Sequence, residues 1–335
     1  MRTRRFLLGG MRVRGALATV VAVALAAIAS ACGGGAPGPD GPLVVFNAGS
    51  LARPIRAALD TFARREGVRV AQESAGSLET ARKLTELGSI PDLIALADAE
   101  VFPRYLMPSH VDGYVRFAHN RMVLAYTDRS RFADEMSTEN WWRILLRPGV
   151  EVARSDPELD PNGYRTLLVW QLAERHYGER GLAARLAAGS PARNVRPKEA
   201  DLVGLLQAGE FDYIWSYESM ARAIGLRYVN LPLEVDLSSS EHAAQYATAS
   251  VTVRGATSGE RVTFTGAPIE YGFAVPRAAP HRELGIRFAR FLLSAEGREI
   301  LRREGLDALE QPSAEGTPGE WFTVVHDSAG AGPSR

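Results

Sequence analysis

An apolar β run, a turn of small residues and an amphipathic helix follow one another twice near the start of the main body of the chain. The first unit is the run 43–46, the turn 47–50 and a helix whose apolar residues recur every three or four positions. A second unit occupies residues 68–87, and another apolar β run follows at 92–97. Strands that alternate with helices at this spacing predict a mostly parallel sheet covered by helices on both faces.

The length and apolar content of the chain predict two lobes. The chain has 335 residues, of which 46% are hydrophobic, and this is comfortable for two lobes of ordinary domain size. A long helix from about residue 163 to 177 and a β run at 211–215 belong to the second lobe. We therefore predict an α/β fold with a hinge between two lobes. The expected segments are lobe 1 (43–127), lobe 2 (128–267), a return to lobe 1 (268–311) and a flexible tail (312–335).

The first 31 residues have the layout of a secretory signal peptide. Five arginines within the first 14 residues precede an apolar run at 16–31, and small residues lead up to Cys32, the only cysteine of the chain. We expect residues 1–31 to be a signal peptide and residues 32–42 to be a lipidated Cys32 with a flexible linker. The alternative is an uncleaved membrane anchor. Lipidation would tether the protein to the cell membrane, on its periplasmic side or outer face.

Charge and motif content argue against several other classes of function. The 39 basic and 39 acidic residues balance, and this argues against a nucleic-acid partner. The six histidines are scattered without metal-ligand spacing, and the sequence lacks the P-loop, Gly-x-Ser-x-Gly, HExxH and Gly-x-Gly-x-x-Gly motifs. We therefore expect a binding protein with no cofactor rather than an enzyme. A secreted hydrolase is the alternative from a different class.

Two turns of small residues are suited to an oxyanion. Residues 47–50 and 74–77 each follow a β run and open a helix, where backbone N–H groups are unpaired and carry partial positive charge. Gly49 lets a ligand approach the backbone, and the hydroxyls of Ser50 and Ser77 add hydrogen-bond donors. Ligands bind at the carboxyl ends of strands in open α/β sheets, where these turns lie. The alternative interpretation is that both serines only cap their helices.

Several segments, taken in order, resemble the tungstate/molybdate-binding proteins of ABC importers, within the type II periplasmic binding protein superfamily. The resemblance extends from about residue 43 to 305. It is most specific in the Asp-Pro-Asn-Gly-Tyr-Arg segment at 160–165 and in the two Ala-Gly-Ser turns at 48–50 and 75–77. The other matching segments are 120–127, 226–229 and 268–272.

This resemblance implies both a function and a mechanism. The two lobes would close over a molybdate or tungstate oxyanion, and the closed form would deliver it to the permease and ATPase subunits of an ABC importer. We expect a monomer, held at the membrane by its lipid anchor. Molybdenum and tungsten can accept additional ligands, so carboxylate oxygens can bind the metal centre, which sulfate and phosphate do not allow. Binding proteins of the same fold for sulfate, phosphate, ferric ion or a small organic acid are the alternatives.

The resemblance also implies which side chains bind the anion. Asp160 is the first expected metal ligand, with a plain N-cap as its alternative role, and Asp156 is the second choice. In the family a carboxylate precedes the tyrosine of a Tyr-x-Ser-x-Ala segment, and here that position is Ser216. Glu218 would share its face on an extended strand and replace the missing carboxylate as a metal ligand, or else Ser216 donates a hydrogen bond and the anion stays tetrahedral. Tyr271 resembles a hinge-side tyrosine that donates to the anion.

Overall fold

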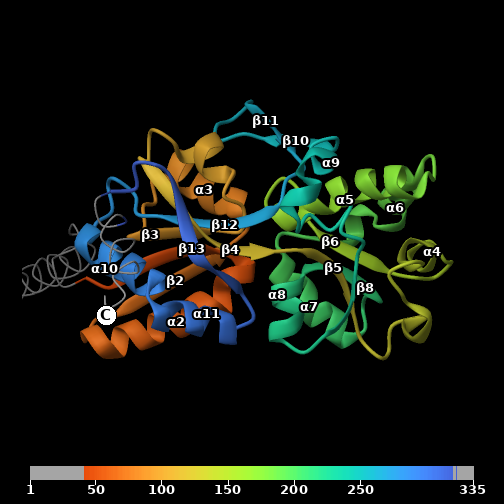
Figure 1. Cartoon of the computed structure of the whole chain (residues 1–335), viewed down its shortest axis with the longest axis horizontal. Coiled ribbons are helices and arrows are strands. Elements are labelled where there is room, and N and C mark those ends of the chain that lie inside the picture. The colour runs from red at the N-terminus through yellow and green to blue at the C-terminus, as the bar shows by residue number, and fades with distance from the viewer. Residues whose placement is uncertain (1–40, 320–321, 323–335) are drawn as a thin grey trace, which may run out of the picture. The chain divides into compact units, whose positions relative to one another are not determined.

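The computed structural model describes residues 41–319 and residue 322. The expected signal peptide, the expected lipidation residue Cys32, most of the expected linker and most of the expected tail lie outside the described residues. Within them, the chain forms two large β-sheets with helices packed on their faces, and a separate two-stranded hairpin (Figure 1). The prediction of an α/β fold with two lobes is confirmed.

A six-stranded mixed sheet forms the first lobe, with the strand order β13-β4-β12-β3-β1-β2. β1 pairs in parallel with β2 and β3, as the repeated strand–turn–helix units predict. β12 runs antiparallel to β3 and β4, and β13 runs antiparallel to β4, so the sheet is mixed rather than mostly parallel. The strands are β1 (Leu43–Ala48), β2 (Val70–Ala75), β3 (Leu93–Leu96), β4 (Gly113–Asn120), β12 (Ile269–Ala274) and β13 (Asp307–Gly316).

Helices cover both faces of this sheet. Figure 1 shows α3 on one side of the sheet and α2 and α11 on the other. The apolar stripe of α2 is buried, and Phe62 on this stripe packs edge-on against Phe288 of α10 with ring centroids 5.2 Å apart. The elements are η2 (Gly49–Leu51), α2 (Ala52–Glu66), α3 (Ser77–Leu87), η3 (Phe102–Leu106), α10 (Arg282–Leu293) and α11 (Ala295–Arg303).

A five-stranded sheet forms the second lobe, with the strand order β7-β6-β8-β5-β9. β6 is parallel to β7 and β8, whereas β5 is antiparallel to β8 and β9. The strands are β5 (Met122–Tyr126), β6 (Val152–Ser155), β7 (Val195–Arg196), β8 (Tyr213–Tyr217) and β9 (Arg227–Asn230). The helices and helical turns are η4 (Ala133–Glu135), α4 (Trp141–Leu145), α5 (Pro161–Tyr177), α6 (Leu182–Gly189), η5 (Ala192–Asn194), α7 (Glu199–Ala208), α8 (Glu218–Ala223), η6 (Ser240–His242) and α9 (Ala243–Tyr246). A separate two-stranded hairpin consists of β10 (Ser250–Arg254) and β11 (Arg261–Thr265).

Two extended crossings connect the sheets, and the first of them shifts an expected boundary. β4 ends at Asn120 and β5 begins at Met122, so the chain changes sheet at Arg121 and the segment 122–127 pairs in the second lobe rather than the first. The chain returns to the first sheet in β12. Residues 312–316 of the expected tail belong to β13, which pairs with β4 as far as Gly316. Among the described residues, no helix combines the length and apolarity that crossing a membrane requires.

Candidate functional site

Tyr271 lies where the two lobes meet and is the centre of a buried chain of hydrogen bonds. Its hydroxyl donates to the Oγ of Ser50 at 3.1 Å and accepts from the Nδ2 of Asn120 at 2.9 Å. The same amide nitrogen donates to the Oγ of Ser219 at 2.7 Å. Ser50 belongs to η2 of the first lobe and Ser219 to α8 of the second, so these side chains connect the lobes. Burial raises the pKa of the Tyr271 hydroxyl, which therefore keeps its proton at neutral pH.

Ser50 and Ser77 lie at the starts of helices without capping them. The N-cap positions of η2, α2 and α3 are Ala48, Leu51 and Gly76, and within the described residues no side chain forms a capping hydrogen bond at any of these three starts. The Oγ of Ser77 accepts a hydrogen bond from the N–H of Ala97 at 3.0 Å, which leaves its O–H able to donate to a ligand. The interpretation of these serines as helix caps is therefore wrong, and both remain candidates for binding an anion.

The two lobes touch directly at the start of α3. A Cβ atom at Gly76 would lie 2.2 Å from the carbonyl oxygen of Leu159 in the second lobe, so only glycine fits there. The N–H of Leu78, which has no partner inside its own helix, donates to that same oxygen at 3.1 Å. Gly49 is less confined, because a Cβ there would make an ordinary contact of 3.5 Å with Lys198 of the second lobe.

Asp160 is buried at the start of α5 and joins two helices. Its Oδ1 accepts a hydrogen bond from the N–H of Asn162 at 3.1 Å and makes Asp160 the N-cap of α5, the role that the sequence analysis kept as its alternative. Its Oδ2 accepts from the N–H of Glu199 at 2.8 Å, at the first residue of α7. Burial raises the pKa of Asp160 to about 6, and the two backbone hydrogen bonds oppose this shift.

Glu199 is a second buried carboxylate, which the sequence analysis did not single out. Its Oε1 accepts from the hydroxyl of Ser216 and from the N–H of Tyr217, both at 2.6 Å. Its Oε2 is buried and has no hydrogen-bond partner among the described residues. Burial and, less strongly, the charge of Asp160 raise the pKa of Glu199 to about 8. The charge of Glu199 also contributes to the raised pKa of Tyr271, so this carboxylate belongs to the same buried group.

Glu218 does not join this group, which corrects the expectation that it replaces the carboxylate missing at Ser216. β8 ends at Tyr217, and Glu218 is the first residue of α8, so the alternation of an extended strand does not reach it. Its carboxylate accepts from the hydroxyl of Tyr228 at 3.3 Å and forms an ion pair with Arg121 at 3.4 Å. The Oδ1 of Asp156, the second-choice ligand, accepts a hydrogen bond from the N–H of Glu158 within the same turn.

Arg165 supplies a buried positive charge beside the group. Its guanidinium lies 3.0 Å from the carboxylate of Asp98 and donates to the carbonyl of Ala97 and to the hydroxyl of Tyr217, both at 2.7 Å. Asp98 and Ala97 belong to the first lobe, whereas Arg165 and Tyr217 belong to the second. These contacts of Arg165 join the two lobes. The guanidinium forms its ion pair with Asp98 and not with Asp160.

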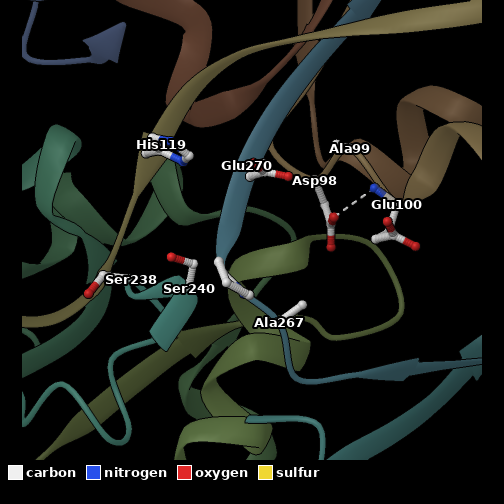
Figure 2. Close-up of a pocket in the computed structure, with 9 residues that line it drawn as sticks. Asp98, Ala99, Glu100, His119, Ser238, Ser240, Ala267 and Glu270 are labelled. Atoms are coloured by element: carbon white, nitrogen blue, oxygen red, sulfur yellow. Dashed lines mark hydrogen bonds between the residues drawn. The ribbon is translucent and has the colours of Figure 1, made fainter. Parts of the chain in front are cut away.

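A cavity of about 230 Å³ beside β12 does not suit an oxyanion (Figure 2). The acidic side chains of Asp98, Glu100 and Glu270 line it together with His119. Glu270 and Tyr271 are successive residues of one strand and therefore face opposite sides of it. The hydroxyl of Tyr271 donates to Ser50, and neither residue lines this cavity. In the part of the chain that the structure describes, no group of three or more His, Cys, Asp and Glu side chains is placed to hold a metal ion.

The sequence and the fold match known solute-binding proteins. A family model described as bacterial extracellular solute-binding protein matches residues 43–307. An uncharacterized solute-binding protein of Petrotoga mobilis is 43% identical over 273 residues, which are 81% of this chain and 85% of that protein. The molybdate/tungstate-binding protein WtpA of Pyrococcus abyssi is 36% identical over an alignment of 301 residues. This alignment covers 82% of this chain and 86% of that protein. The periplasmic molybdate-binding protein of Azotobacter vinelandii shares the fold, with a TM-score of 0.56 at 15% identity over 80% of this chain and 100% of that one.

Proposed function

Because the chain belongs to the bacterial extracellular solute-binding protein family, we propose that it captures molybdate or tungstate outside the cytoplasmic membrane. The relatives named as molybdate/tungstate-binding proteins support this choice of ligand. The observation that carries the proposal is the buried group between the lobes. It combines hydroxyl donors at Ser50 and Tyr271 with the carboxylates of Asp160 and Glu199.

The donors in this proposal come from both the backbone and the side chains. The helix start at Ser50 presents N–H groups with partial positive charge, which bind oxyanions in many proteins. At the start of α3 the N–H groups of Leu78 and Glu79 already donate to the carbonyl of Leu159, so Ser77 would contribute its hydroxyl. The hydroxyl of Tyr271, which donates to the Oγ of Ser50, would turn and donate to an oxygen of the bound anion. Gly49 keeps the first turn open to the ligand, because it has no side chain between the backbone and the second lobe.

The carboxylates restrict the kind of anion that fits. A carboxylate repels a dianion unless it is protonated or binds the metal centre of that anion. We therefore assign Asp160 as one metal ligand, as the sequence suggested, and Glu199 in place of Glu218 as the second carboxylate. Ser216 then acts by donating to Glu199, which fixes one carboxylate oxygen, and among the described residues the other oxygen has no hydrogen-bond partner.

Delivery to an ABC importer and attachment through Cys32 are part of this proposal. A ligand that contacts both lobes favours the closed form, and a permease that recognises this form receives the loaded protein. Replacement of Cys32 by alanine in the full chain should release the protein from membranes into the soluble fraction. Equal membrane association of both forms would contradict lipidation at Cys32.

Thermal unfolding with a panel of anions tests the ligand. Tungstate or molybdate at one hundred times its dissociation constant should stabilise the folded protein by about 2.7 kcal/mol, because it binds only the folded state. Sulfate, phosphate and ferric ion at the same concentration should have little effect. A shift with one of these three and none with the metal oxyanions would reject the proposal.

The two glutamates provide a matched pair of variants for the site itself. Glu199→Gln should weaken tungstate binding, measured by calorimetry, because it replaces the carboxylate oxygen that is assigned as metal ligand while keeping the shape and the acceptor for Ser216. Glu218→Gln should bind tungstate like the wild type, because its carboxylate pairs with Arg121 outside the group. The reverse order of effects would restore Glu218 as the ligand.

A further inference from the structure

The β10–β11 hairpin touches both lobes although it belongs to neither sheet. Its two strands pair from Ser250 with Thr265 to Arg254 with Arg261, and the chain then continues directly into β12. Figure 1 shows the hairpin above the junction of the lobes, between α3 and α9. A segment placed in this way can hold the lobes together only if it binds both of them.

The second lobe holds the base and one side of the hairpin. The side-chain amide of Gln171 in α5 donates to the carbonyl of Ser250 at 2.9 Å and accepts from its N–H at 3.2 Å. The ring of Phe264 stacks on Tyr164 of α5, with centroids 4.6 Å apart. A pair of hydrogen bonds and an aromatic stack therefore anchor the hairpin to α5 of the second lobe.

The first lobe holds the tip of the hairpin through polar contacts. The hydroxyl of Thr85 in α3 donates to the carbonyl of Ala256 at 2.9 Å. The guanidinium of Arg254 pairs with Glu86 of the same helix, and the hydroxyl of Tyr105 in η3 donates to the carbonyl of Arg254. All of these partners are in the first lobe, and separation of the lobes would break every one of these contacts.

The loop that carries Asp160 is connected to the same helix and to the same hairpin. The carboxylate of Glu158 accepts a hydrogen bond from the N–H of Arg254 at 2.6 Å, and its backbone carbonyl accepts from Arg82 of α3 at 2.7 Å. The next carbonyl, that of Leu159, accepts from the start of α3. Closure of the lobes at the anion site and docking of the hairpin on α3 therefore involve the same two segments.

We propose that the β10–β11 hairpin is a clasp that docks on α3 when the lobes close and thereby sets how fast a bound anion leaves. This proposal rests on the proposed function for the identity of the ligand. The clasp contacts form after the anion has entered, so their loss speeds release and leaves capture almost unchanged. Affinity is then set partly by residues that do not touch the anion.

Stopped-flow release of tungstate from the full-length protein tests the clasp. The double variant Thr85→Val/Glu86→Gln removes two contacts on the first-lobe side, and Tyr105→Phe removes a third while keeping the ring. We expect each to raise the dissociation rate constant, the double variant at least tenfold, with the association rate constant changed by less than a factor of three. Glu296→Gln is the control, because its carboxylate pairs with Arg65 within the first lobe, at an exposed position.

The possible results distinguish failure of the clasp proposal from failure of the proposed ligand. Release rates of the double variant and of Tyr105→Phe within twofold of the wild type would overturn the clasp, as would equal acceleration in Glu296→Gln. A slower association at unchanged release would also overturn it, because the hairpin would then act before closure. If the wild type binds no tungstate, the proposed function fails, and the same rates are measured with whichever anion of the panel stabilises the protein.

Discussion

Replacement of Gly76 by alanine should block closure of the lobes while leaving each lobe folded. The backbone of Gly76 has φ −64° and ψ 147°, which alanine adopts without strain. The added Cβ would lie 2.2 Å from the carbonyl oxygen of Leu159, so the second lobe must withdraw by roughly 1 Å to restore an ordinary contact. The hydrogen bonds from Leu78 and Glu79 to that oxygen, at 3.1 and 3.3 Å, would then exceed hydrogen-bond length.

The expected loss follows from those two bonds. Each contributes about 0.5–1.5 kcal/mol net, so the closed state loses about 1–3 kcal/mol and tungstate affinity falls roughly 5- to 150-fold. Calorimetric titration measures this loss, and thermal unfolding without ligand checks that the lobes remain intact. Gly204→Ala is the control, because an added Cβ there would have no atom within 4 Å and the residue lies outside the anion site. Equal affinity in both variants, or a large loss of ligand-free stability in Gly76→Ala, would refute the reasoning.

Three further predictions concern single residues. Tyr271→Phe should lower tungstate affinity, measured by calorimetry, roughly tenfold or more, because a hydrogen bond to a charged ligand contributes about 1.5–3 kcal/mol. Glu199→Gln should flatten the pH dependence of the unfolding free energy. The folded-state pKa of Glu199, about 8, lies above the ordinary 4.5, so its stabilising contribution is lost as the pH rises from about 5 to 8, and the amide does not titrate. Urea unfolding at both pH values measures this, and an unchanged slope would contradict it. Gly163→Ala should destabilise the protein by about 1–3 kcal/mol in urea unfolding, because its Cβ would lie 2.5 Å from the carbonyl oxygen of Ser155, whereas Gly204→Ala, with open space around it, should not.

The parts of the fold that local patterns determine could be predicted from the sequence. The strand–turn–helix units at 43–87 became β1, η2, α2, β2 and α3, because apolar periodicity and small turn residues act over a few neighbouring positions. The antiparallel half of the first sheet could not be foreseen in the same way. It arises because β4 leads the chain out of the first lobe and β12 leads it back, so that these strands pair across a long stretch of sequence. Local sequence patterns do not reveal such pairing.

The candidate site shows the same limit. Asp160 and Tyr271 are expected from the resemblance to the tungstate/molybdate-binding proteins, and Asp160 also from its position before Pro161 at a helix start. Glu199 stands 17 positions from Ser216 at the start of another helix, where a glutamate is an ordinary partner of the helix dipole. Only the packing of α7 against β8 brings the two together.

The charge balance of the buried group limits which anions it can hold. Arg165 is already paired with Asp98, whereas Asp160 and Glu199 accept hydrogen bonds only from neutral N–H and O–H groups. Above about pH 8, where both carboxylates are charged, sulfate beside them is repelled, but a metal-oxo anion can accept their oxygens at its metal centre. The turns at Ser50 and Ser77 would serve any oxyanion, so selectivity comes from the second lobe. Replacement of the Glu199 carboxylate by an amide should therefore reduce the difference between tungstate and sulfate affinity above pH 8 rather than abolish anion binding.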